Sequence, residues 1–89
     1  MPTYRIEFTP KARKQVDALD ASIRRRVDAA IAKLGTVPFP SGVKALNQKG
    51  EEAIYRIRVA KDYRVLYTVD DGRLLVLILK AGHRREVYR

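Results

Sequence analysis

The chain contains no cysteine, a single histidine (His83) and no long apolar run. Without cysteine, neither a disulfide framework nor a thiolate metal site can form, and one histidine does not suffice for a typical zinc or iron site. The longest apolar stretch, residues 74–79, is far shorter than the ~20 residues that a transmembrane helix needs. The N-terminus alternates from the start and lacks the apolar segment of a signal peptide. We therefore expect a cytoplasmic protein that does not enter a membrane.

Charge of one sign dominates the sequence. Nineteen Lys and Arg against ten Asp and Glu give a net charge of +9 over 89 residues. Residues 1–35 and residues 36–89 are both basic, so the charge is not confined to a tail. A small basic domain attracts polyanions. The candidate partners are a nucleic acid, an acidic protein or an anionic membrane surface, and the alternative is a merely soluble basic surface.

The N-terminal part of the sequence predicts one strand followed by two helices. Residues 4–8 alternate between apolar and charged side chains, as in a half-buried strand. Thr9 and Pro10 are typical of a helix start, with Thr9 as the N-cap. Apolar residues at helical spacing continue to Leu34, interrupted near Asp20, a second N-cap candidate. Gly35 stands where a left-handed glycine would end the second helix.

The rest of the sequence predicts a meander of three strands. We expect strands at residues 54–59, 63–69 and 73–80, with a type I′ turn at Asp71-Gly72. The last strand is apolar on both faces, which favours a central position covered on both sides. Residues 44–50 are ambiguous, and the first strand pairs with the fourth or lies at the sheet edge. The whole chain, residues 1–89, thus predicts a single α+β domain with its helices on one face of a small sheet.

Three arginines interrupt the apolar pattern of the meander. Arg56 and Arg58 are two apart, so they share one face of their strand, opposite Tyr55, Ile57 and Val59. If Arg64 of the next strand joins that face, three guanidinium groups lie close together. Like charges on neighbouring strands repel, whereas an anion between them reverses the effect. Guanidinium groups match phosphate oxygens in a bidentate manner.

The C-terminal segment, residues 80–89, adds further cations with one imidazole and one aromatic ring. It holds His83, Arg84 and Tyr88, and an aromatic residue among arginines suits stacking on the bases of single-stranded RNA. Each residue also has an ordinary interpretation. The strand arginines can be solvated or paired with acids, Tyr88 can cover the core, and His83 can be a turn residue.

The order of these motifs resembles the RelE branch of the RelE/ParE toxin superfamily, the toxins of type II toxin–antitoxin pairs. The resemblance lies in a helical hairpin followed by YRIRV, DYRVLY, DDG and a terminal AGHRREVYR. It implies a RelE-like fold and a ribosome-dependent endoribonuclease that needs no metal or cofactor. Such a toxin cleaves mRNA in the ribosomal A site, using the ribose 2′-OH to leave a 2′,3′-cyclic phosphate. It also implies a RelB-like antitoxin as partner, and contact with operator DNA only through the antitoxin complex.

The resemblance also assigns candidate site residues. The basic positions of the family fall on Arg56, Arg58, Arg64 and Arg84, and its C-terminal tyrosine falls on Tyr88. The two second-strand positions are lysines in the best-known pattern. Arginine stays protonated and cannot act as a general base, but it can stabilise developing negative charge. The remaining candidates for proton transfer are His83, whose unperturbed pKa lies near neutrality, and Tyr88, if its pKa is lowered.

Two other functions fit the same sequence. A ParE-like toxin that inhibits DNA gyrase shares the fold and the basic charge, but needs no cationic cluster around one phosphate. A basic RNA- or protein-binding module without catalytic activity is also consistent with arginines in place of lysines.

Overall fold

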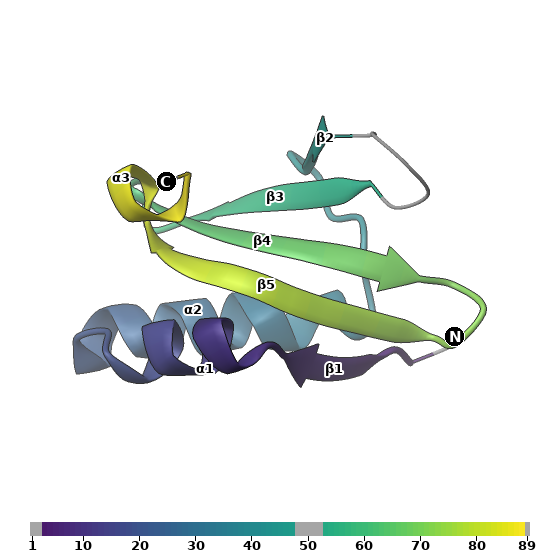
Figure 1. The fold of residues 1–89 in the computed structure, drawn as a ribbon, viewed down its shortest axis with the longest axis horizontal. Helices are drawn as coiled ribbons and strands as arrows, with labels where there is room; N and C mark the ends of the chain where they lie inside the picture. The colour runs from purple at the N-terminus through teal and green to yellow at the C-terminus, as the bar shows by residue number, and fades with distance from the viewer. Residues whose placement is uncertain (1–2, 48–52, 89) are drawn as a thin grey trace.

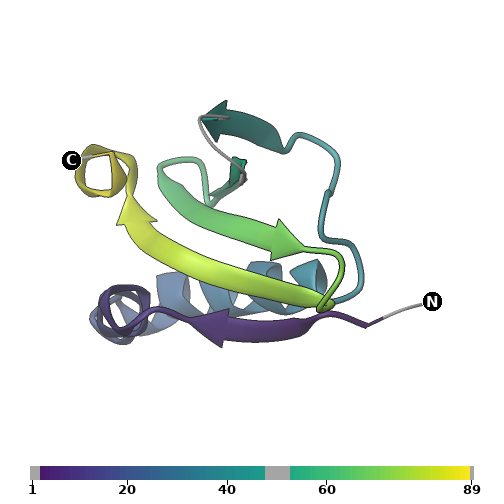
Figure 2. The same cartoon turned by 45° about the vertical axis from the view of Figure 1, so that its right-hand side comes forward.

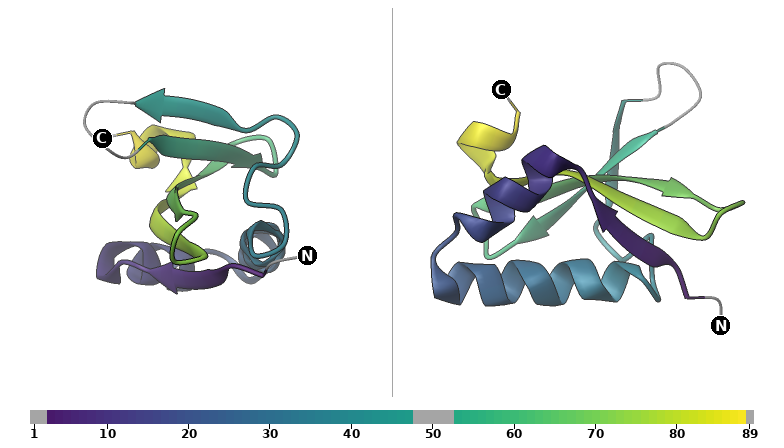
Figure 3. Two further views of the ribbon diagram at one scale, coloured as in Figure 1. Left: turned by 90° about the vertical axis from the view of Figure 1, so that its right-hand side faces the viewer. Right: turned by 60° about the horizontal axis from the view of Figure 1, so that its bottom comes forward.

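In the computed structural model, which describes residues 3–47 and 53–88, a five-stranded sheet carries two helices on one face (Figures 1 and 3). The order of elements along the chain is β1 (Arg5–Phe8), α1 (Pro10–Asp17), α2 (Ala21–Leu34), β2 (Lys44–Asn47), β3 (Ile54–Val59), β4 (Tyr63–Asp70), β5 (Leu75–His83) and α3 (Arg84–Val87). Across the sheet the order is β1-β5-β4-β3-β2, with β1 parallel to β5 and the other pairs antiparallel. The expected α+β fold is confirmed, and β2 adds an edge strand that the sequence did not predict.

The two helices begin where the sequence predicts. Thr9 Oγ1 accepts a hydrogen bond from the Ala12 amide at 3.1 Å, and Pro10 is the first helical residue of α1. Asp20 precedes α2 without a side-chain cap bond. Because the apolar residues of both helices recur at helical spacing, they form a stripe that packs on the sheet.

The core fills the space between this stripe and one face of the sheet. Its fully or nearly buried members are Ala12, Val16, Val27, Ile31, Leu34, Ile57, Val59, Val65, Tyr67, Val76, Ile78 and Ala81. Tyr67 is its largest side chain, and its hydroxyl donates to the Pro38 carbonyl at 2.7 Å. Burial raises the pKa of Tyr67, because the phenolate would have to exist away from water.

The end of α2 differs from the expected glycine cap. Gly35 has φ −65° and ψ −29°, so it stays in the right-handed region and the prediction of a left-handed cap is wrong. The glycine instead permits a close approach, since the Tyr4 amide donates to its carbonyl at 2.6 Å. A Cβ at Gly35 would lie 3.1 Å from the Tyr4 carbonyl oxygen. The small residue thus lets β1 start directly beside the end of α2.

The turn between β4 and β5 is also not the predicted type I′ turn. Gly72 does not adopt a positive φ, whereas Leu74 does, with φ +50°. The Arg73 amide donates to Asp70 Oδ1 at 3.1 Å, which closes a longer loop than the two-residue turn. The hairpin is therefore present, but Asp70 and Leu74, rather than Asp71-Gly72, determine the conformation of its loop.

Strand β5 contains a bulge that controls which side chains reach each face. Leu66 of β4 pairs with Lys80, but the next residue, Tyr67, pairs with Ile78, so Leu79 is the extra residue. In a regular strand Ile78 and Lys80 would share a face. The bulge places them on opposite faces, and every residue after Leu79 changes side.

Strand β5 lies between β1 and β4, as its apolar sequence suggests, but it is fully covered on one face only. Val76 and Ile78 are completely buried under the helices, whereas Leu75 and Leu77 on the other face are partly exposed. No helix in the described parts of the chain is long and apolar enough to cross a membrane.

Candidate nucleic-acid interface

Two rows of cations cross the face of the sheet that α1 and α2 leave uncovered, which we call the open face. Residues paired in a ladder share a face of the sheet. Arg58 of β3 pairs with Arg64 of β4, and Arg56 of β3 pairs with Lys44 of β2. Neighbouring strands lie ~4.8 Å apart, and the two rows are ~6.5–7 Å apart along β3. The geometry therefore brings Arg56, Arg58 and Arg64 together, as the sequence predicts.

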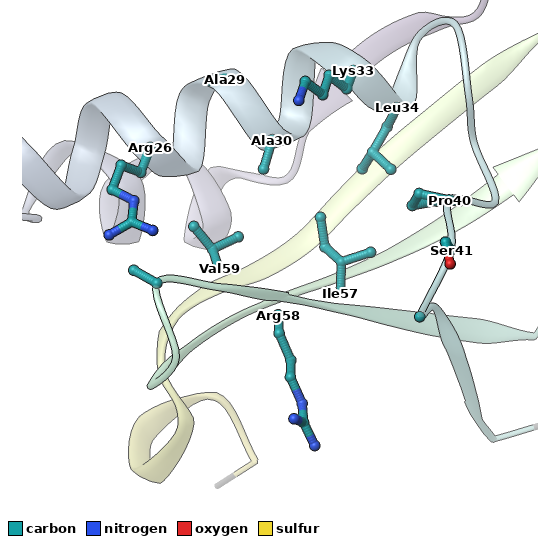
Figure 4. Close-up of a pocket in the computed structure, with 12 residues that line it drawn as sticks. Arg26, Ala29, Ala30, Lys33, Leu34, Pro40, Ser41, Ile57, Arg58 and Val59 are labelled. Atoms are coloured by element: carbon teal, nitrogen blue, oxygen red, sulfur yellow. The ribbon is translucent and has the colours of Figure 1, made fainter.

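Arg58 is exposed on the open face. Figure 4 shows its side chain pointing away from α2, while Ile57 and Val59 on either side of it point toward the helix. Within residues 3–47 and 53–88, no carboxylate forms an ion pair with Arg58. Its guanidinium is thus available to an anion from outside the chain.

Arg56 is only 8% exposed, which is unusual for a charged residue that has no carboxylate partner in the described parts of the chain. Its Nε donor is buried and has no hydrogen-bond acceptor among the described residues. A buried, unpaired donor costs free energy unless a partner completes it. The described part of the structure therefore leaves one donor of Arg56 unsatisfied, in the strand that also carries Arg58.

Arg64 is 6% exposed and partly occupied by the backbone. Its Nη1 donates to the carbonyls of Lys61 at 2.8 Å and Tyr63 at 3.0 Å. Lys61 lies in the turn between β3 and β4, where Ala60 and Lys61 adopt positive φ values of 50° and 66°, and Tyr63 is the first residue of β4. The turn therefore fixes the guanidinium of Arg64 in position opposite Arg58.

The short helix α3 lies beside the same turn, away from α1 and α2 (Figures 1 and 2). The Arg84 amide donates to the Asp62 carbonyl at 2.8 Å, and Arg84 Nε lies 3.9 Å from Asp62 Oδ1. Val87 is fully buried and sits over Gly82, the ladder partner of Arg64. The C-terminal segment is thus anchored at the edge of the open face, with Arg84 exposed next to the arginine rows.

His83 does not join the arginines. It pairs with Tyr63, and its ring meets the Tyr63 ring edge-on at 5.5 Å, on the face that the helices cover. Its Nδ1 accepts a hydrogen bond from the Arg85 amide at 3.2 Å, so the side chain caps α3. The bulge at Leu79 is the reason, because it turns Gly82 rather than His83 toward the open face.

Tyr88 ends α3 with 51% of its surface exposed. The phenol therefore does not cover the core, which was its alternative interpretation. An exposed ring at the edge of a cationic face is suited to stacking on a base.

Two cations of the open face were not among the predicted site residues. Lys44 lies on β2, which the sequence did not reveal as a strand because its alternation covers only four residues. Lys80 reaches the open face through the bulge in β5, opposite Leu66. The basic composition of residues 80–89 was a signal for Lys80, whereas Lys44 had none.

The acidic residues of the described parts mostly neutralise other cations. Arg5 pairs with Glu7, Arg24 with Asp17 and Asp28, and Arg73 with Asp70, all with substantially exposed side chains. Exposed pairs of this kind contribute little to stability. None of these carboxylates pairs with Arg56, Arg58 or Arg64.

A pocket lies on the other side of β3, between α2 and the loop that follows it (Figure 4). Ala30, Leu34, Ile57 and Val59 form its apolar lining, and Arg26 of α2 adds a charge. The side chain of Arg58 points away from this space, so the pocket and the open face are separate surfaces.

Comparison with known proteins agrees with this geometry. Residues 6–88 match the family model described as the ParE toxin of the type II toxin–antitoxin system parDE. Toxin RelG of Mycobacterium tuberculosis is 32% identical over 87 residues, covering 97% of both chains. The chain belongs to the RelE/ParE superfamily and is a RelE-family toxin of a type II toxin–antitoxin system.

Solved structures support the same assignment. The archaeal RelE–RelB complex from Pyrococcus horikoshii OT3 contains a chain that matches with a TM-score of 0.80 and 30% identity. The match covers 94% of this chain and 98% of that one. The isolated E. coli RelE toxin matches with a TM-score of 0.75 and 25% identity, covering 96% and 90% of the two chains. The RelE-like fold predicted from the sequence is thereby confirmed.

Proposed function

We propose that this toxin is a ribosome-dependent endoribonuclease that cleaves mRNA in the ribosomal A site. The 2′-OH of a ribose gives its proton to water and attacks the adjacent phosphate. The bond to the 5′-oxygen breaks, that oxygen takes a proton from water, and a 2′,3′-cyclic phosphate and a 5′-OH remain. The observation that carries the proposal is the pairing of Arg58 with Arg64 across β3 and β4, with neither guanidinium bonded to a carboxylate in the described parts of the chain.

The arginines act on the charge of the transition state. As the 2′-oxygen attacks, negative charge grows on the phosphate oxygens, and preorganised donors stabilise that charge more than they stabilise the substrate. Arg58 supplies an exposed guanidinium, and Arg64 supplies one held in place by two carbonyls. Arg56, two residues away along β3, adds positive charge beside this row. Arg84, at the edge of the face, completes the clamp.

Proton transfer does not fall to the arginines, which stay protonated. We assign His83 the role of capping α3 rather than of carrying a proton, since its Nδ1 already accepts from the Arg85 amide. Tyr88 stacks on the base next to the cleaved bond and orients it. Catalysis then rests on positioning and charge stabilisation, and the ribosome supplies much of the positioning. Free RNA is therefore a poor substrate.

A RelB-like antitoxin is the proposed protein partner. RelE-family relatives are found in complexes with RelB, in the archaeal structure and in E. coli. A chain of charge +9 attracts an acidic antitoxin segment to the same surface that binds RNA. Operator DNA is contacted only through that complex.

The proposal is tested with purified toxin on programmed, translating ribosomes. Primer extension should reveal cuts within A-site codons, and the same message without ribosomes should stay largely intact. Intact message at every A-site codon would reject the nuclease function.

A ParE-like function has one observation in its favour, the match of residues 6–88 to a family model named for ParE. A toxin of that kind binds DNA gyrase and performs no chemistry on RNA. Inhibited supercoiling by gyrase, with mRNA intact on ribosomes, would support it over cleavage.

A further inference from the structure

The two rows of the open face differ in where they lie on the sheet. The row formed by Arg58 and Arg64 spans β3 and β4, in the interior of the sheet. The row formed by Lys44 and Arg56 spans β2 and β3, at its edge. One phosphate cannot contact all four side chains from the middle of the first row, because the second row lies one strand repeat away.

The edge row has the features of an anion site in its own right. Lys44 and Arg56 are ladder partners, and like charges directly opposite each other are unfavourable unless an anion lies between them. More than nine-tenths of Arg56 is buried, yet its Nε donor has no acceptor. Lys44 is exposed beside it, and no carboxylate within residues 3–47 and 53–88 forms an ion pair with either cation.

We propose that Lys44 and Arg56 form a second phosphate subsite, which holds the RNA phosphodiester next to the one that is cleaved. This inference rests on the proposed function and adds Lys44 to it as a substrate-positioning residue. The separation of the rows, ~6.5–7 Å along the strand, suits consecutive phosphates of an extended single strand. A regularly charged polyanion fits two rows one repeat apart better than scattered carboxylates of a protein do.

The second subsite aligns the RNA on the open face. A phosphate held at the β2 edge and another held between β3 and β4 fix the register of the strand. The ribose next to the cleaved phosphate is then held beside the Arg58–Arg64 row. Binding of a neighbouring phosphate is thereby used to orient the reacting one.

Two RNA probes without a nucleophile separate the subsites. The first is a trinucleotide with 2′-O-methyl groups on every ribose, which has two phosphodiesters, and the second is the matching dinucleotide, which has one. Affinities are measured by NMR titration of the full-length toxin at low salt, for the wild type and for Lys44→Ala. Lys11→Ala, which removes an exposed lysine of α1, is the matched charge control.

We expect the wild type to bind the trinucleotide more tightly than the dinucleotide. Lys44→Ala should weaken trinucleotide binding about three- to fivefold, the effect of one exposed ion pair, and leave dinucleotide binding unchanged. The slope of log affinity against log salt should fall by about 0.7 for the trinucleotide, as for one lost phosphate contact on a single strand. Lys44→Arg should restore binding, and Lys11→Ala should change neither probe selectively.

Several results would overturn the second subsite. Equal wild-type affinity for the two probes, or an equal effect of Lys44→Ala on both, means that the edge row holds no separate phosphate. Unchanged RNA binding together with weaker binding of an acidic peptide of alternating Glu and Leu means that the row serves a protein partner. If the wild type from the same preparations still cleaves mRNA on ribosomes, the nuclease function stands and only the second subsite is rejected.

Discussion

The two faces of the sheet are built from alternate residues of the same strands, yet they are completed in opposite ways. On the helix side, Tyr55, Ile57 and Val59 of β3 pack against other apolar groups of the chain. On the open face, Arg56 and Arg58 face other cations. The first face is satisfied within the molecule, whereas the proposed function has RNA phosphates complete the second. Stability and function are therefore assigned to neighbouring residues of one strand.

The largest expected effect comes from removing the exposed guanidinium of the open face. Arg58→Ala should lower the single-turnover rate of A-site cleavage by about 100- to 1000-fold, as does loss of one donor to a developing oxyanion. Its free energy of unfolding should stay within about 0.5 kcal/mol of the wild type. Arg25→Ala, an exposed cation of α2, is the control and should change neither quantity. A rate for Arg58→Ala close to that of the wild type would remove this residue from the site.

Substitution of Ile57, the residue next to Arg58, should reduce stability and leave cleavage nearly unchanged. Ile57→Ala should lower the free energy of unfolding by about 2–4 kcal/mol, because it leaves a cavity in the core. Urea denaturation measures the change. Cleavage per folded molecule should be nearly that of the wild type, since the side chain points away from the open face. A selective loss of activity in the folded variant would mean that the two faces are not independent.

Arg56 should show the conflict between stability and function within one residue. Arg56→Met replaces a buried guanidinium, whose Nε donor has no acceptor among the described residues, by an apolar side chain. It should raise the free energy of unfolding by about 1–2 kcal/mol. Cleavage should fall in the same variant. Arg64→Met is the matched control, because it deletes donors that have two carbonyl acceptors and should destabilise the protein. Destabilisation by both substitutions would indicate that Arg56 is already satisfied.

Tyr67, the buried phenol on the helix side of the sheet, is expected to give the smallest effect at neutral pH. Burial raises the pKa of Tyr67 above its usual 10.0, so above pH 10 the unfolded chain loses this proton before the folded chain does. The stability that this difference provides is complete below pH 10 and falls by about 1.4 kcal/mol per pH unit above it. Above pH 10, the free energy of unfolding of Tyr67→Phe should therefore fall less steeply than that of the wild type. Parallel stability–pH curves for the two proteins would contradict it.

The sequence predicts the elements that have strong local signals. Thr9 and Pro10 mark the start of α1, and the alternation in residues 54–59 separates Ile57 from Arg58. Local signals mislead where the tertiary structure decides. Gly35 is small because β1 passes close to it, and the Asp71-Gly72 pair does not form the two-residue turn that its composition favours.

In the candidate site too, some residue positions follow from local sequence patterns and others depend on tertiary structure. The three strand arginines are brought together by strand alternation and hairpin pairing, which the sequence displays. His83 is turned away by a bulge of one residue, Leu79, for which an apolar run such as residues 74–79 carries no signal. Lys44 depends on a four-residue edge strand whose existence requires β3 beside it.

On the proposed function, the open face, not the helix side, binds the phosphates of RNA. NMR of the arginine Nε–H groups can be followed during titration with the 2′-O-methyl trinucleotide. We predict the largest shifts at Arg56 and Arg58, and little change at Arg24, Arg25 and Arg26 of α2. Shifts concentrated on the α2 arginines, with Arg56 and Arg58 unaffected, would contradict it.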